Sequence, residues 1–182
     1  HPPIFGATGS DSGHALMGEL GLGLCSFSVA APPEDVARRI EIYRKAIATC
    51  TQPLGKFIND KAAAFTMVNC APTADESREV SEESYLWYVK TSVAMITSVA
   101  TWLEEMKQDL GTYDYLKPIT EMVKGNALDA LDYAYLRDSN AVLSGTPDDV
   151  IKTAKGYEAA GVDLLLCLIN PYKISHEKAM QT

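Results

Sequence analysis

The sequence has few of the residues that build metal sites, and it has no long apolar run. Its 182 residues include 3 histidines and 4 cysteines, without a Cys-x-x-Cys pair or metal-ligand spacing. No apolar stretch approaches the ~20 residues of a membrane span. Lysine and arginine number 16 against 24 acidic residues, a net charge of −8. We therefore expect no metal site, no nucleic-acid partner and no membrane partner, because nucleic acids and anionic lipids attract basic surfaces.

The cysteines are far apart in the sequence, and three of them, Cys25, Cys70 and Cys167, lie inside apolar runs. Such positions favour buried, reduced thiols that act as small hydrophobic side chains. This usage is typical of a cytoplasmic protein.

The length and composition suit one packed domain, with 47% hydrophobic and 22% charged residues. The two ends are unusual for a complete domain. An apolar segment follows His1 within three residues, and a helix start at Ser175 is followed by only a few residues. We expect a piece of a longer protein, truncated at both ends.

Four apolar segments predict buried strands over residues 3–8, 22–27, 62–70 and 162–169. Capped helical patterns separate them, over about 33–50, 76–108 and 147–160. This alternation predicts an α/β fold with a parallel sheet. Four strand–helix units with unequal crossovers indicate a partial (β/α)8 TIM barrel, since a whole barrel needs ~250 residues.

The segment 76–140 is predicted to be a helical insertion before the last strand. It begins with a capping box at Thr73 and Glu76, and its pattern weakens after Gly111 into short helices and loops. Its aromatic residues fit the core of a helix or, alternatively, a substrate wall; they are Tyr85, Trp87, Tyr88 and Trp102.

The loop after the first strand consists of small polar residues and precedes a helix. Small residues let backbone N–H groups approach an anion, and the helix dipole favours negative charge there. Ser10 and Ser12 add hydroxyl donors. An ordinary turn that caps the next helix explains the same residues, so the sequence leaves both interpretations open.

Several motifs, in order, resemble the bacterial luciferase-like flavin-dependent monooxygenases, specifically the carboxyl-terminal half of their barrel. The motifs are His1-Pro2-Pro3-Ile4, Thr8-Gly9-Ser10-Asp11, Gly21-Leu22-Gly23-Leu24, Gly145-Thr146-Pro147-Asp148-Asp149-Val150, Gly156-Tyr157, Ala160-Gly161-Val162-Asp163 and His176-Glu177-Lys178-Ala179-Met180. The resemblance covers nearly the whole chain and implies a barrel enzyme whose first four strands are absent here.

The resemblance implies a flavin-binding role for the first loop, with Ser10 aligned to a serine that contacts the phosphate. The implied cofactor-binding residues are Thr8, Gly9, Ser10, Asp11, Ser12 and Phe27. Asp11 departs from the family, which often has proline there, and a carboxylate beside a phosphate is unfavourable unless it points away or caps the helix. Phe27 fits packing on the isoalloxazine ring or plain core packing. No catalytic residue carries over, because the family's recognised positions belong mostly to the absent half.

Other polar residues have simpler interpretations. His14 is expected on the surface of a short helix, and His176 at a solvated helix start. Asn69 and Asn170 follow strands, where they either cap turns or face a pocket.

The resemblance implies FMN as cofactor, with reduced flavin and dioxygen acting on a small organic substrate. A deazaflavin-dependent oxidoreductase of the same superfamily is the nearest enzyme alternative, and a non-catalytic half-barrel with a structural or interaction role is the other. We expect a homo-oligomer or pairing with a missing amino-terminal half, because half a barrel exposes strand edges.

Overall fold

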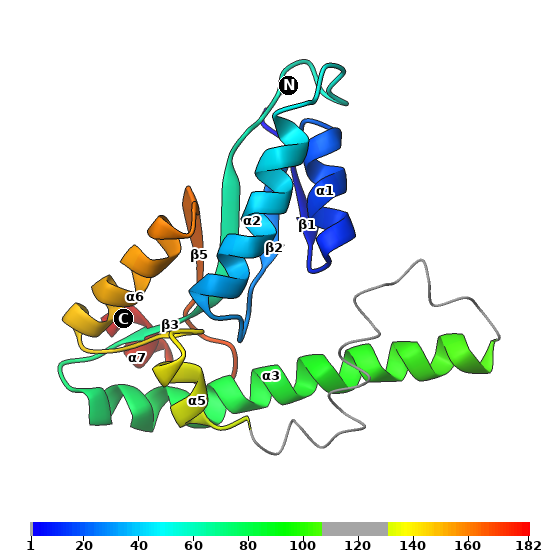
Figure 1. Cartoon of the computed structure of the whole chain (residues 1–182). Coiled ribbons are helices and arrows are strands. Elements are labelled where there is room, and N and C mark those ends of the chain that lie inside the picture. Colours follow the sequence, from blue (N-terminus) through cyan, green and yellow to red (C-terminus); the bar gives the residue numbers. More distant parts are fainter. Residues whose placement is uncertain (1, 107–130) are drawn as a thin grey trace.

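The computed structural model describes residues 2–106 and 131–182, which form a parallel sheet with helices on one face (Figure 1). The strands are β1 (Phe5–Thr8), β2 (Gly23–Phe27), β3 (Ala62–Cys70), β4 (Leu143–Gly145) and β5 (Leu164–Leu168). The helices are α1 (Asp11–Glu19), α2 (Pro33–Ile47), α3 (Ala74–Glu105), α5 (Tyr133–Asp138), α6 (Pro147–Ala159) and α7 (His176–Gln181).

Every strand pairing is parallel, which confirms the predicted α/β fold. The strands β1, β2 and β3 are neighbours in chain order, and β3 pairs with two strands along its length. Residues 63–67 of β3 pair with β5, and residues 68–70 pair with β4. The short strand β4 was not predicted, because Leu143-Ser144-Gly145 is too short to show an apolar pattern.

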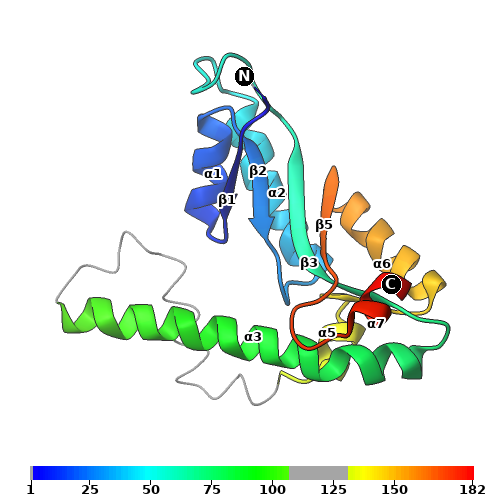
Figure 2. The ribbon, with the colours of Figure 1, turned by 180° about the vertical axis from the view of Figure 1, so that it is seen from behind.

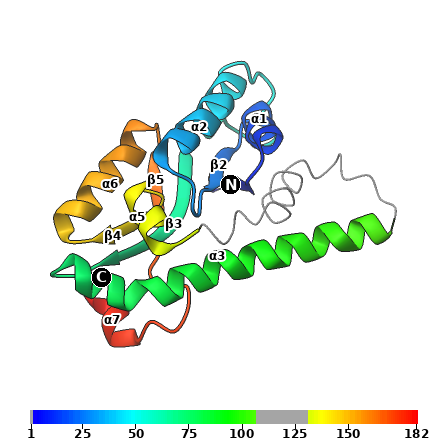
Figure 3. The ribbon, with the colours of Figure 1, turned by 60° about the horizontal axis from the view of Figure 1, so that its bottom comes forward.

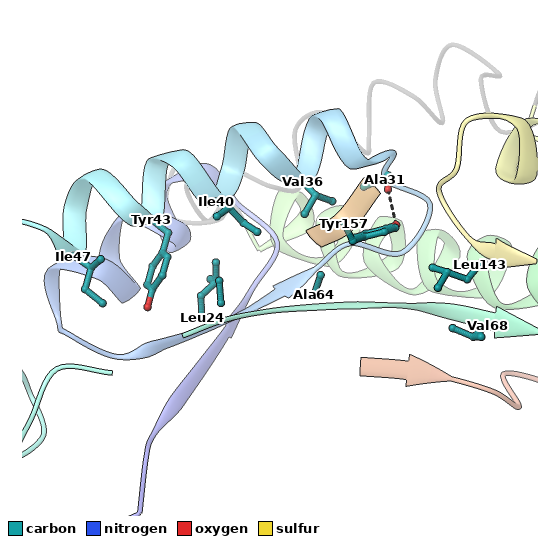
Figure 4. Close-up of a cluster of buried hydrophobic side chains, with 11 residues drawn as sticks. Leu24, Ala31, Val36, Ile40, Tyr43, Ile47, Ala64, Val68, Leu143 and Tyr157 are labelled. Carbon is teal, nitrogen blue, oxygen red and sulfur yellow. Dashed lines mark hydrogen bonds between the residues drawn. The ribbon is translucent and has the colours of Figure 1, made fainter. Parts of the chain in front are cut away.

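The helices α1, α2 and α6 cover one face of the sheet. Figure 2 shows the strands from the opposite side, with these helices behind them. The buried stripe of α2 is the predicted one and comprises Val36, Ile40, Tyr43 and Ile47. It packs on Leu24 and Ala64 of the sheet and belongs to the same core cluster as Tyr157 of α6 (Figure 4). This cluster is the larger part of the hydrophobic core.

Two buried tyrosines join the elements of this core through their hydroxyl groups. The Tyr43 hydroxyl donates to the carbonyl oxygens of Leu22 and Asn59, each at 3.0 Å. The Tyr157 hydroxyl lies 3.2 Å from the Ala31 carbonyl oxygen, as Figure 4 shows, and 3.2 Å from that of Ala141. Burial raises the pKa of both phenols to about 12, so both remain protonated donors.

The long helix α3 crosses below the carboxyl ends of the strands (Figures 1 and 3). The Thr73 side chain caps it by accepting from the Glu76 N–H, which is one half of the predicted capping box. Below the sheet, α3 and α5 contribute Tyr85, Tyr133 and Leu136 to a second buried cluster with Met67 of β3. The predicted insertion 76–140 includes residues 107–130, which lie outside the described residues.

The prediction that all four strands are buried is wrong for β1 and β5. Phe5 of β1 is 37% exposed, and Leu164 and Leu166 of β5 are 47% and 40% exposed. Within the described residues each of these strands pairs with one neighbour, and on the face opposite α1, α2 and α6 their covered part lies near α3, where Leu168 packs against the second buried cluster. These apolar side chains are therefore exposed in the part of the chain that the structure describes.

Two other burial predictions need correction. Tyr85 is buried as expected, but Trp87 and Trp102 are 40% and 56% exposed. Trp102 lies where α3 extends beyond the elements that cover its first half (Figure 1). The ring of Trp87 stacks on Tyr172, with centroids 4.2 Å apart. All four cysteines are free, but none is fully buried as expected: Cys25, Cys50 and Cys70 are half-buried, and Cys167 on β5 is exposed.

Candidate anion site at the end of the first strand

The predicted cofactor loop connects β1 to α1 at the carboxyl edge of the sheet. Thr8 ends the strand, Ser10 is the N-cap residue and Asp11 begins the helix. A Cβ atom added at Gly13 would lie 1.9 Å from the Thr8 Oγ1 atom. The glycine therefore allows the first turn of α1 to close tightly on the end of the strand.

The hydroxyl groups of the loop gather within one helical turn. The Ser10 Oγ atom accepts from the Gly13 N–H at 3.0 Å and lies 3.2 Å from the Ser12 Oγ atom. The Ser10 N–H points to the Thr8 Oγ1 atom at 3.3 Å. These bonds are those of a capped helix start, and they also concentrate N–H and O–H groups where an anion is favoured.

His14 is fully buried beneath this loop, which corrects the expectation of a surface position. Its Nδ1 atom lies 2.6 Å from the Ser10 carbonyl oxygen, and its Nε2 atom lies 2.9 Å from the Ser26 Oγ atom. A carbonyl oxygen only accepts, so Nδ1 carries the proton and Nε2 accepts from the Ser26 hydroxyl. Burial lowers the pKa of His14, and the hydrogen bond to Ser10 partly opposes this shift. The lowered pKa keeps the ring neutral.

Sequence reasoning missed this histidine because its partner lies on another element. Ser26 is a polar residue inside an apolar strand, and its side chain faces α1. A buried serine on the strand beside a histidine-bearing helix is the one signal that the sequence offered.

Two arginines of α2 lie next to the loop. Arg38 donates to both carboxylate oxygens of Asp11, at 2.5 and 3.1 Å, and this hydrogen bond holds the pKa of Asp11 below its usual value. Arg39 donates to the Phe27 carbonyl oxygen at 3.4 Å. The buried Arg39 Nε atom has no hydrogen-bond partner among the described residues. The carboxylate of Asp11 is thus paired, while Arg39 retains an unused donor.

Phe27 ends β2 on the sheet face opposite the helices. Its ring is 41% exposed and stacks on Phe65, with centroids 5.9 Å apart and an angle of 23° between the rings. A Cβ atom added at Gly9 would lie 3.9 Å from the Phe27 Cβ atom, so the loop and this ring are neighbours. Phe27 is therefore not a core residue within the described chain.

The remaining polar candidates separate into turn residues and buried groups. Asn170 bonds both the N–H and the carbonyl oxygen of Ile174, as a turn residue does. His176 is exposed at the start of α7, as expected. Asn69 is buried and donates to the Thr182 Oγ1 atom at 3.2 Å. Asn69 therefore does not line the loop of the candidate site.

A cluster of buried hydroxyl groups lies between α3, α5 and β4, and the sequence did not indicate it. Ser144 is its centre, 2.7 Å from the Tyr133 hydroxyl, 2.9 Å from that of Ser77 and 3.3 Å from that of Ser81. The partners are up to 67 residues apart in sequence, so no local pattern could reveal them. The cluster ties β4 to the underside of the sheet.

No group of three histidine, cysteine or acidic side chains that could hold a metal ion occurs in residues 2–106 and 131–182. Among the helices that the structure describes, none combines the length and apolar character of a membrane span.

Comparison with known proteins gives a family match and several similar folds. The family model described as luciferase-like monooxygenase matches residues 1–164. The oxygenating constituent of 3,6-diketocamphane monooxygenase from Pseudomonas putida, solved in complex with FMN, is 19% identical with a TM-score of 0.64. The comparison covers 100% of this chain and 46% of that chain.

Two other solved structures resemble the chain to a similar degree. Monooxygenase RslO1 from Streptomyces bottropensis is 16% identical with a TM-score of 0.59, over 100% of this chain and 45% of that one. The coenzyme F420-dependent tetrahydromethanopterin reductase from Methanopyrus kandleri is 17% identical with a TM-score of 0.57, over 98% and 48%. The chain thus spans about half the length of these structures. The comparison with curated proteins found no match.

Proposed function

The chain belongs to the luciferase-like monooxygenase family, and on that premise we propose that it supplies the flavin-phosphate-binding half of a flavin-dependent monooxygenase. Residues 1–182 form the carboxyl-terminal half of the barrel in this proposal, with 76–140 as a helical insertion. The enzyme oxidises a small organic substrate in the cytoplasm.

The unused donor of Arg39 is the observation that carries this proposal. A buried N–H group without a partner is costly, and a bound anion would satisfy it. Arg39 lies beside Phe27, and Phe27 lies beside the loop at Gly9. The amides at the start of α1, the hydroxyls of Ser10 and Ser12, and Arg39 together fit the phosphate end of a flavin mononucleotide.

Each group has a defined role in binding. The α1 amides and the Ser10 hydroxyl donate to the phosphate, and the pairing of Asp11 with Arg38 removes a competing negative charge. His14 holds the Ser10 carbonyl oxygen and so fixes the loop. Phe27 offers a ring face on which the isoalloxazine can pack. The reduced flavin, when bound, supplies the electrons for the reaction with dioxygen.

A deazaflavin-dependent oxidoreductase is the second candidate, because the similar reductase from Methanopyrus kandleri depends on coenzyme F420. Flavin and deazaflavin cofactors both present a phosphate to this loop. Parallel titrations with FMN and with coenzyme F420 distinguish the two enzymes by affinity. A non-catalytic half-barrel would bind neither.

The test is a fluorescence titration of the protein with FMN and with riboflavin, which lacks the phosphate. Ser10→Ala removes a charge-assisted hydrogen bond worth about 1.5–3 kcal/mol, so FMN affinity should fall about tenfold or more. Riboflavin affinity should hardly change. Equal losses for the two ligands would mean that Ser10 is only a helix cap.

Thr146→Ala is the matched control, because Thr146 is the N-cap residue of α6 in the same way that Ser10 caps α1. Both substitutions cost about 1 kcal/mol of stability as lost caps. Only the substitution at Ser10 should change the ratio of FMN affinity to riboflavin affinity. A protein that binds neither ligand would refute the proposed function.

A further inference from the structure

His14 lies between the two parts of the candidate site, which are the loop after β1 and the end of β2. Its ring is fully buried, with Nδ1 2.6 Å from the Ser10 carbonyl oxygen and Nε2 2.9 Å from the Ser26 Oγ atom. Ser26 is the partner of Thr8 in the ladder between β1 and β2, and it directly precedes Phe27. One side chain therefore contacts both the loop and the strand that carries the aromatic ring.

The contact with Ser10 determines the direction of an amide group at the start of α1. The Ser10 carbonyl oxygen accepts from the backbone N–H of His14 at 3.0 Å and from its ring at 2.6 Å. In a trans peptide unit the N–H group points opposite to the carbonyl group. The N–H of Asp11 is therefore directed out of the helix start, which is where a helix favours a bound phosphate.

The contact with Ser26 holds the end of β2 from the side of the helices. Side chains alternate along a strand, so Ser26 faces α1 while the next residue, Phe27, faces away from it. The Phe27 carbonyl oxygen accepts from Arg39 of α2 at 3.4 Å. The Phe27 Cβ atom lies 3.9 Å from the position of a Cβ atom added at Gly9. His14 and Arg39 together thus keep the Phe27 ring beside the loop.

We propose that His14 is a positioning residue that fixes the phosphate end and the ring end of the flavin site relative to each other. This role rests on the proposed function and gives a task to a side chain buried behind both parts of the site. The Nδ1 contact orients the Asp11 amide for the phosphate, and the Nε2 contact orients Phe27 for the isoalloxazine ring. Each contact therefore serves one end of the ligand.

Only the neutral ring with its proton on Nδ1 makes both contacts. Nδ1 donates to a carbonyl oxygen, and Nε2 accepts from the Ser26 hydroxyl. Burial is the main cause that lowers the pKa of His14, and the two nearby arginines of α2 lower it as well. The hydrogen bond to Ser10 and the charge of Asp11 act in the opposite direction. The lowered pKa keeps the ring in the neutral form that both contacts require.

The test is a fluorescence titration of the full-length protein with FMN and riboflavin, in two variants that each keep one contact. His14→Asn places an amide N–H near the position of Nδ1 and has no atom at Nε2, so it keeps only the contact with Ser10. Affinity for both ligands should fall by the same factor, about three- to tenfold, because both contain the isoalloxazine ring. The ratio of FMN affinity to riboflavin affinity should therefore stay at its wild-type value.

His14→Gln places its amide near the position of Nε2, so it keeps only the contact with Ser26. FMN affinity should fall about three- to tenfold while riboflavin affinity stays the same, since only FMN carries the phosphate. His176→Gln is the control, because His176 is exposed at the start of α7 and neither affinity should change. The same pattern of losses in the two His14 variants would show a histidine that only stabilises the fold, and would overturn the proposal.

Nuclear magnetic resonance of the unmodified protein is a second measurement that does not depend on a variant. Long-range proton–nitrogen spectra should place the ring proton of His14 on Nδ1, and both ring nitrogens should shift when FMN or riboflavin binds. A proton on Nε2, or ring signals that neither bound ligand changes, would overturn the role of His14 and leave the proposed function standing. A wild-type protein that binds neither ligand would refute the proposed function, and the role of His14 with it.

Discussion

The two helices that follow short parallel strands in this structure, α1 and α6, begin in opposite electrostatic surroundings. Each has a hydroxyl residue as N-cap, Ser10 in α1 and Thr146 in α6. In α6 the carboxylate of Asp149 accepts from the Thr146 N–H at 2.9 Å and from its hydroxyl at 2.7 Å. The start of α6 thus already binds an anionic group, the carboxylate of its own residue Asp149.

In α1 the first-turn carboxylate belongs to Asp11, directly after the N-cap, and it is paired with a side chain of another helix. Asp11 pairs with Arg38, and Arg39 lies close by with an unused N–H group. The comparison teaches that the start of α1 remains electrostatically suited to an external anion, because its own carboxylate is paired with Arg38, whereas that of α6 is not. Under the proposed function α1 would be the binding helix and α6 a structural one.

Among the substitutions that test this contrast, the largest effect on the free energy of unfolding is expected at Tyr157 of α6. Its side chain is buried and its hydroxyl bonds two carbonyl oxygens, so Tyr157→Ala should lower the free energy of unfolding by about 3–5 kcal/mol. Tyr157→Phe keeps the ring and should cost about 1 kcal/mol. Urea denaturation followed by circular dichroism measures both.

A structural role for α6 further requires that Tyr157→Phe leave the ratio of FMN to riboflavin affinity at its wild-type value. A selective loss of FMN affinity in this variant would break the contrast between the two helices.

The start of α6, the buried stripe of α2 and the parallel sheet could be predicted from the sequence, because local patterns determine them. The start of α6 at Thr146-Pro147-Asp148-Asp149 and the stripe of α2 follow from capping rules and helical spacing, and the structure confirms both. The parallel sheet follows from apolar runs separated by helices. The loop after β1 was likewise identified from its small residues.

The rest depended on contacts between distant residues. The pairing of Asp11 with Arg38 joins residues 27 positions apart, and the bond from His14 to Ser26 joins two elements. No periodicity encodes either contact. The exposure of Leu166 could not be predicted for a different reason, since an apolar strand has the same sequence whether or not the layer that covers it is present.

A second way to break the comparison is to place a carboxylate at each N-cap. Aspartate is a good N-cap residue, so neither Ser10→Asp nor Thr146→Asp should abolish folding. Ser10→Asp adds a like charge at the anion site, and FMN affinity should fall more than tenfold while riboflavin affinity stays the same. Thr146→Asp should leave both affinities unchanged. Equal effects of the two substitutions in the fluorescence titration would contradict an anion site at α1.

A smaller effect is expected from pH, through the buried histidine of α1. The pKa of His14 is lower in the folded protein than the ordinary value of 6.5, so below that value the unfolded chain binds a proton that the folded chain does not. This contribution to stability is fully present above pH 6.5 and is lost as the pH falls toward the folded pKa. Urea midpoints measured from pH 8 to pH 5 should therefore decline.

His14→Gln is the control for this pH dependence, since glutamine can keep a polar contact with Ser26 without titrating. The difference between wild type and variant should grow smaller as the pH falls, because only the wild type loses the contribution of the histidine. Parallel curves for the two proteins would show that other groups cause the decline.

The smallest expected effect distinguishes the carboxylate of Asp11 in α1 from that of Asp149 in α6. Asp11→Asn removes an exposed ion pair with Arg38, which is worth about 0–1 kcal/mol, and leaves the arginine free to approach a phosphate. FMN affinity should rise about two- to threefold at low salt and less at higher salt, because exposed charges are screened. Asp149→Asn removes the carboxylate of the capping box and should cost about 0.5–1 kcal/mol of stability without changing FMN affinity. If Asp11→Asn lowered FMN affinity, the carboxylate would be positioning the loop, and the unfavourable charge would not be its main effect.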